Sequence, residues 1–162
     1  LNKNSIGIEI TNPGHEFNYK KFTKEQINSL LRLSRFLIKK YKINLKNILG
    51  HSDIAPERKK DPGEKFPWQY LSQNKVGLWH TVKKNELIKN RKVKTTKIDK
   101  ELFINNLFKI GYSKRFLKNA SKLRHLNYIT EAFQRRYRQD LIDGKIDQEC
   151  LIISQNLIKV FQ

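Results

Sequence analysis

Apolar residues recur at helical spacing most clearly over residues 23–41. Thr23 is followed three residues later by Gln26, which is the signature of a capping box at a helix start. The apolar positions of this stretch lie on one face of the predicted helix: Ile27, Leu30, Leu31, Leu37, Ile38 and Tyr41. The pattern predicts an amphipathic helix that buries this face.

Two shorter segments show patterns typical of β-strands. Residues 5–10 alternate and end at a turn over residues 12–14, and residues 47–50 form a short apolar run that ends at Gly50. A strand, a helix and a strand in succession form a parallel crossover unit. The sequence therefore predicts an α/β fold, with a mixed sheet and flanking helices.

The carboxy-terminal part contains three further helical patterns. The first covers residues 102–110 and ends at Gly111, the second covers residues 128–137, and the third begins after Asp147. We therefore predict a small three-helix domain over residues 99–162. Cys150, the single cysteine, has apolar neighbours and is expected in its core.

Residues 81–98 contain seven Lys and Arg residues against one Glu and show no apolar period, so they are predicted to be a linker after a domain of residues 1–80. The net charge of +19 suits an acidic partner such as nucleic acid, anionic lipid or a wall polymer. Coding bias would also explain it, because the lysines are spread along the chain. No base-reading motif accompanies them, so nucleic acid is not a predicted partner. A transmembrane segment of roughly 20 apolar residues is also absent from the sequence.

The loop over residues 50–68 carries the candidate chemistry. It holds three of the four prolines, and Asp61 follows His51 by ten positions. Zinc hydrolases commonly use three protein ligands, with histidine and carboxylate among them. His51 and Asp61 could supply two of these ligands. Lys59 could stabilise a developing oxyanion, and Glu9 could exchange a proton with water and the leaving amine.

The motifs at 51–56, 58–59, 61–63 and 66–68, with residues 4–10 upstream, closely resemble the signatures of the zinc-dependent N-acetylmuramoyl-L-alanine amidases of the AmpD/AmiD type. The resemblance covers roughly residues 1–80, the second half of a family catalytic domain. It implies hydrolysis of the bond between N-acetylmuramic acid and L-alanine in peptidoglycan or muropeptides. It also implies Zn²⁺ as cofactor, metal ligands His51 and Asp61, catalytic residues Glu9 and Lys59, and a place in the bacterial cell envelope, in the periplasm rather than the cytoplasm.

The resemblance also predicts a missing ligand. The family's first zinc histidine lies on an earlier strand, upstream of the motif at residues 4–10. We therefore expect an amino-terminally truncated amidase, whose site an upstream fragment could complete. His15, in the turn after Gly14, and His80 are the nearby alternatives. Without the family resemblance, the sequence alone favours a Glu9 side chain that faces solvent on an edge strand.

Residues 132–138, followed by 143–147, resemble the small three-helix peptidoglycan-binding domain often appended to these amidases. Any small helical bundle could share this pattern. Two hypotheses remain: a zinc hydrolase, or a catalytically inactive remnant that binds peptidoglycan through its helical domain. Asp53 and Arg58 are expected to brace the loop rather than bind metal.

Overall fold

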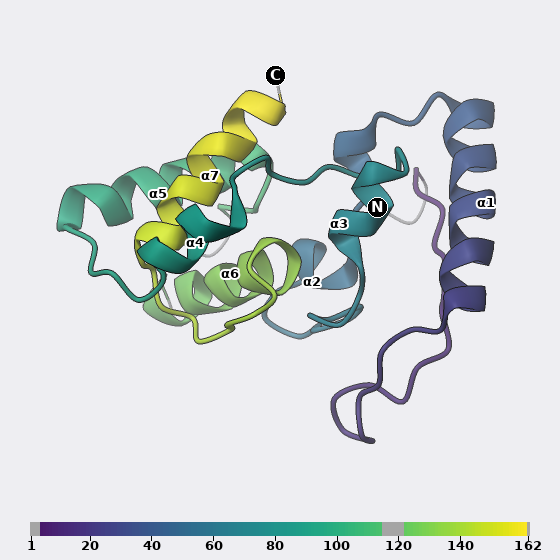
Figure 1. Cartoon of the computed structure of the whole chain (residues 1–162), viewed down its shortest axis with the longest axis horizontal. Coiled ribbons are helices and arrows are strands. Elements are labelled where there is room, and N and C mark those ends of the chain that lie inside the picture. The colour runs from purple at the N-terminus through teal and green to yellow at the C-terminus, as the bar shows by residue number, and fades with distance from the viewer. Residues whose placement is uncertain (1–3, 115–121, 162) are drawn as a thin grey trace.

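The computed structural model describes residues 4–114 and 122–161 as helices joined by loops (Figure 1). No helix in these ranges is long and apolar enough to cross a membrane. The elements are, in chain order, α1 (Lys24–Tyr41), the 3₁₀ helix η1 (Leu45–Asn47), α2 (His51–Ile54), α3 (Trp68–Gln73), α4 (Lys84–Asn90), α5 (Lys97–Ile110), α6 (Lys122–Tyr137) and α7 (Gln148–Val160).

The predicted α/β fold is wrong, because the described residues contain no strand. Residues 5–10 are irregular, with Ile6 and Ile8 exposed by 51% and 39%. At the predicted strand 47–50 the chain instead ends the 3₁₀ helix η1 at Asn47 and continues without a strand. The Asn44 side chain caps the start of η1, because it accepts a 3.1 Å hydrogen bond from the Lys46 N–H. A β-strand requires a neighbour that pairs with its backbone groups, and an alternating sequence cannot supply that neighbour.

Helix α1 confirms the prediction made for residues 23–41. The Thr23 hydroxyl accepts from the Gln26 N–H at 3.2 Å, and the Gln26 side chain accepts from the Thr23 N–H at 2.9 Å, which completes the capping box. Its inner face packs in an amino-terminal cluster with α3 and the loop before it: Ile27, Leu30, Leu31, Phe66, Trp68, Leu71 and Val76. This cluster supports the end of the loop that carries the candidate site.

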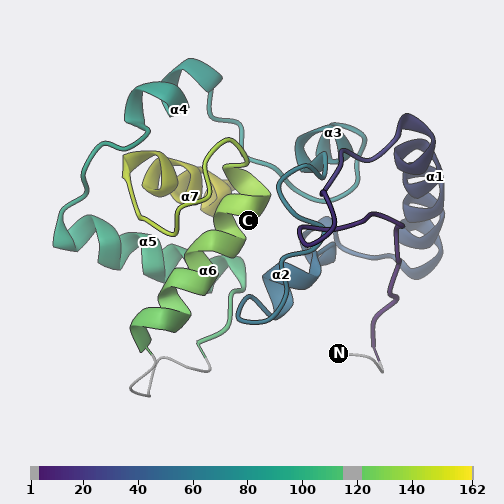
Figure 2. The same cartoon turned by 90° about the horizontal axis from the view of Figure 1, so that it is seen from below.

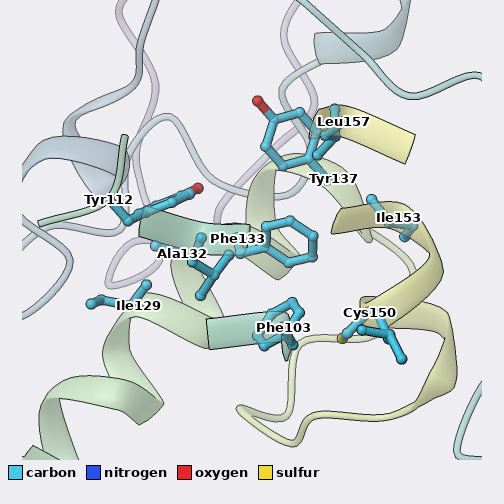
Figure 3. Close-up of a cluster of buried hydrophobic side chains, with 11 residues drawn as sticks. Phe103, Tyr112, Ile129, Ala132, Phe133, Tyr137, Cys150, Ile153 and Leu157 are labelled. Atoms are coloured by element: carbon cyan, nitrogen blue, oxygen red, sulfur yellow. The ribbon is translucent and has the colours of Figure 1, made fainter. Parts of the chain in front are cut away.

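The three predicted carboxy-terminal helices are present as α5, α6 and α7, although α6 begins at residue 122 rather than 128. Figure 3 shows the core that they share, in which Phe103 and Phe133 meet edge to face at 5.1 Å. Cys150 lies fully buried there, as predicted, and burial raises the pKa of its thiol to about 12. The helices therefore form one compact unit around aromatic side chains.

Residues 81–98, the predicted linker, contain α4. This helix lies beside α7 (Figures 1 and 2), and Leu87 packs against the core of α5–α7. Arg91, just after α4, binds the fully buried Glu149 carboxylate with two hydrogen bonds of 2.8 Å. Such a bidentate pair fixes both position and orientation. The basic segment is thus bound to the helical unit along much of its length.

The motif at residues 132–138 is buried in α6 rather than displayed on the surface. Gln134 accepts from the backbone N–H groups of Asp143 and Gly144 at 3.0 and 2.9 Å. Arg138, with a side chain that is 0% exposed, pairs with Asp143 at 2.7 Å and with Asp147 at 2.5 Å. These residues hold the α6–α7 turn in place.

The two helical groups meet at Trp79 and His80. Trp79 packs against both hydrophobic clusters, and α2 contacts α6. His80 is 7% exposed, and its Nε2 lies 3.2 Å from the Tyr137 carbonyl oxygen. That carbonyl can only accept, so Nε2 carries the hydrogen, and Nδ1 finds no hydrogen-bond partner within the described residues.

Acid is expected to weaken this junction through His80. Burial lowers the pKa of His80 from 6.5 to about 4. In the unfolded chain, His80 would bind a proton with the ordinary pKa of 6.5. Stability from this group is therefore fully present above pH 6.5 and is lost as the pH falls toward 4, by about 2–3 kcal/mol. Urea unfolding between pH 4 and 7 measures this loss, and His80→Phe should flatten it. An unchanged acid dependence in that variant would contradict the assignment.

Candidate metal and catalytic site

The candidate site begins where η1 gives way to α2. Gly50 caps α2, and His51 is the first residue of that helix. The Ser52 N–H donates to the Asp61 carbonyl oxygen at 3.0 Å, which brings the far end of the loop back to the helix start. As a result, His51 Nδ1 lies 2.5 Å from Asp61 Oδ2, with side-chain exposures of 63% and 55%. The structure therefore brings the two predicted metal ligands together at the surface.

The donor set of this pair suits zinc in part. An imidazole nitrogen and a carboxylate oxygen are common zinc ligands, with bonds of about 2.0–2.2 Å. Two atoms on one tetrahedral ion would lie about 3.3 Å apart, so metal entry would require the pair to open by less than about 1 Å. The described ranges contain no group of three His, Cys, Asp or Glu residues that could hold a metal. The described part of the chain thus gathers two of the predicted ligands and no third.

The two predicted catalytic residues lie on separate segments. Lys59 is exposed in the loop, where its backbone N–H donates to the Ala55 carbonyl oxygen at 2.9 Å. Glu9 is exposed on the irregular segment before α1. Within the described ranges, no hydrogen bond or ion pair joins either side chain to His51 or Asp61. Their assignment as catalytic residues stays a prediction.

The two alternative histidines have other roles in the fold. His80 lies in the junction with Tyr137, as described above. His15 bonds Glu64 at 3.0 Å and packs against the Tyr19 ring at 4.5 Å. Burial raises the pKa of Glu64, but hydrogen bonds from His15 and the Glu64 backbone, together with the charges of His15 and Arg135, outweigh burial, and the net pKa is lowered.

Tyr19 braces the loop directly after Asp61. Its hydroxyl donates to the Pro62 carbonyl oxygen at 2.6 Å and accepts from the Lys65 N–H at 3.0 Å. Gly63, at φ +82°, packs so closely that an added Cβ would lie 2.6 Å from this hydroxyl. Glycine is required there both for its backbone angle and for space. The segment before α1 therefore holds the Asp61 end of the loop.

Asp53 braces the His51 end of the loop, as predicted. It accepts from the Gly50 N–H at 2.8 Å. Arg58 was expected to act with it but is exposed, and within the described residues only its backbone N–H makes a hydrogen bond, to the Ala55 carbonyl oxygen. The cation that does pair with Asp53 is Arg136 of α6, which the sequence did not indicate. The motif at residues 132–138 predicted a helix. Nothing in the neighbouring sequence, however, indicates which of its arginines binds a residue 83 positions earlier in the chain.

Known proteins have sequences similar to that of this chain. Residues 1–64 match the N-acetylmuramoyl-L-alanine amidase family. AmiD of Escherichia coli is 32% identical over 166 residues, which cover 99% of this chain and 59% of AmiD. The anhydro-N-acetylmuramyl-L-alanine amidase AmpD of Haemophilus influenzae is 44% identical over 73 residues, which cover 44% of this chain and 38% of AmpD. The chain is thus homologous to amidases of the AmiD and AmpD type.

Solved structures agree with the sequence relationship. E. coli AmiD in complex with anhydro-N-acetylmuramic acid-L-Ala-D-γ-Glu-L-Lys superposes with a TM-score of 0.75 at 32% identity, over 88% of this chain and 55% of AmiD. AmpDh3 from Pseudomonas aeruginosa superposes with a TM-score of 0.72 at 26% identity, over 90% of this chain and 56% of AmpDh3. The chain therefore spans less than two thirds of the length of these relatives.

Proposed function

We propose that this chain takes part in hydrolysis of the amide bond between N-acetylmuramic acid and the L-alanine of the stem peptide. The observation that carries the proposal is the His51–Asp61 pair, which lies within the stretch that matches the amidase family. Peptidoglycan or a muropeptide would be the substrate. The muropeptide bound in the AmiD structure supports this class.

In the proposed site, His51 and Asp61 would hold zinc, with at least one ligand from outside the described residues. Bound there, zinc would lower the pKa of a water molecule to about 7 and polarise the scissile carbonyl. Lys59 would place its ammonium against the oxyanion that develops on that carbonyl. Glu9 would take a proton from the water and return it to the leaving amine. Both roles require these exposed side chains to approach the pair in the complete site.

We also propose a division of the chain, based on its similarity to these amidases. Residues 1–80 would belong to the catalytic part, residues 81–98 would connect it, and residues 99–162 would be a wall-binding part that acts in the cell envelope. The alignment with AmiD covers 99% of the chain, so the similarity to that amidase extends over α5–α7 as well as over residues 1–80. The buried motif at 132–138 would then maintain the fold of this part rather than form its binding surface.

A chimera tests the proposed reaction. The part of E. coli AmiD that precedes its alignment with this chain would be joined to residue 1, and the resulting chimera incubated with anhydro-N-acetylmuramic acid-L-Ala-D-γ-Glu-L-Lys as substrate. Mass spectrometry should show the free L-Ala-D-γ-Glu-L-Lys peptide. His51→Ala and Asp61→Ala should abolish its release, because each removes a proposed metal ligand. Glu57→Ala, an exposed carboxylate of the same loop, serves as the matched control and should retain it. Peptide release that survives His51→Ala would contradict the proposal.

A further inference from the structure

A single arginine of α6 reaches into the base of the loop that carries His51. The Arg136 side chain is 2% exposed, although α6 lies more than 80 positions away in sequence. Its Nη1 donates to the Asp53 carboxylate, and its Nη2 donates to the Ile48 carbonyl oxygen at 2.8 Å. The guanidinium also lies 4.2 Å from the centre of the Trp68 ring. Arg136 thus contacts residues before, within and after the loop.

The Asp53 carboxylate connects this contact to the metal pair. Tyr112, which precedes α6, donates its hydroxyl to Asp53 Oδ1 at 2.9 Å, and the Gly50 N–H donates to Oδ2 at 2.8 Å. Gly50 directly precedes His51. A Cβ at Gly50 would lie 2.7 Å from the Pro62 ring, and Pro62 directly follows Asp61. The backbone neighbours of both proposed ligands therefore pack together beside the carboxylate that Arg136 binds.

The electrostatics of the contact favour a fixed geometry. Burial lowers the pKa of Arg136, but the Asp53 carboxylate, together with the electrostatic influence of Tyr137 and Tyr112, raises it by more in total, so the net pKa lies above the ordinary value and the guanidinium keeps its charge. A planar guanidinium can bind Asp53 and the Ile48 carbonyl oxygen at once. A lysine ammonium, which is a compact point charge, lacks that fork geometry. The position of the loop base thus depends on arginine rather than on positive charge alone.

We infer that Arg136 is a positioning residue, through which the carboxy-terminal helices set the approach of His51 to Asp61. The inference rests on the proposed function, in that it gives α6 a part in building the amidase metal site. Arg136 touches neither ligand, so it acts through Asp53, Gly50 and the start of α2. The carboxy-terminal unit would then serve the catalytic site as well as the proposed binding of the cell wall.

Hydrogen–deuterium exchange of the full chain tests this inference. Arg136→Lys should speed exchange at the Ser52 and Ala55 amides, whose acceptors are the carbonyl oxygens of Asp61 and His51, by about tenfold or more. The amides of α7 should remain as protected as in the unaltered chain. Arg138→Lys is the matched control, because Arg138, which directly follows α6, is an equally buried, ion-paired arginine whose partners all lie in the carboxy-terminal unit. It should leave the Ser52 and Ala55 amides unchanged.

A zinc titration of the same variants adds a second readout, which reports on the proposed metal ligands themselves. Added zinc should bind about 10- to 100-fold more weakly to Arg136→Lys than to Arg138→Lys, as expected when the support of a metal ligand is lost. Should Arg136→Lys fail to fold, Tyr112→Phe removes one hydrogen bond to the same carboxylate and should show the same local pattern at smaller amplitude.

The two proposals can fail separately. Exchange that rises uniformly along the chain, or equally in both arginine variants, would overturn the positioning role. An unaltered chain or chimera that binds no zinc would remove the proposed metal site. The exchange pattern would then still decide whether Arg136 sets the loop.

Discussion

Replacing Arg138 by alanine is expected to destabilise the carboxy-terminal helices by about 3–5 kcal/mol, because it leaves buried carboxylates without their cation. Arg138 is 0% exposed and binds Asp143 and Asp147, while its Nε donates to the Leu141 carbonyl oxygen at 3.0 Å. Asp147 also caps α7 by accepting from the Cys150 N–H at 3.0 Å. The substitution therefore removes an ion pair and loosens a helix start together.

Urea unfolding followed by circular dichroism measures this loss. Arg124→Ala is the matched control, because Arg124 is an exposed arginine of α6, the helix that Arg138 directly follows, and it should change stability by less than about 0.5 kcal/mol. Equal effects of the two substitutions would show that the buried cluster does not hold the helices together.

Replacing Lys59 by alanine in the chimera is expected to lower turnover by about 10²- to 10³-fold while zinc remains bound. This is the range observed when a group that stabilises an oxyanion is removed. Lys59 is exposed and pairs with no carboxylate within the described residues, so its loss should leave stability unchanged. Lys60→Ala, the exposed neighbour, is the control and should retain turnover.

Glu9→Gln should behave like Lys59→Ala, since glutamine keeps the shape of the side chain but is a poor proton acceptor. Turnover and zinc content of the purified variant are both measured. A variant that loses zinc together with turnover would make Glu9 a metal ligand instead of a base.

Features set by neighbours in sequence could be predicted. The capping box of Thr23 and Gln26, the cap at Asp147 and the burial of Cys150 all depend on residues within a few positions. The loop could also be recognised from the sequence, because its turn residues and its candidate metal-binding residues lie in one continuous stretch. His51 and Asp61 meet as predicted because the chain between them turns back on itself.

Features that depend on distant partners could not be predicted. The alternation at residues 5–10 is compatible with a strand, but only a second strand can pair with its backbone. The partner of Asp53 illustrates the same limit. Arg136 lies on a helix that the pattern located correctly, yet burial of a guanidinium against Asp53 and Trp68 depends on how two helical groups pack. The packing of α4 against α7 likewise depends on contacts between segments that lie far apart in the sequence.

The most direct test of the metal assignment is a calorimetric zinc titration of the chain and of the chimera, each with and without His51→Ala. The chimera should bind one equivalent tightly. The chain alone should bind at least about 10- to 100-fold more weakly, because only two ligands gather in its described part. His51→Ala should remove the binding from both proteins. Tight binding of one equivalent by the chain alone, or binding that survives His51→Ala, would contradict the account.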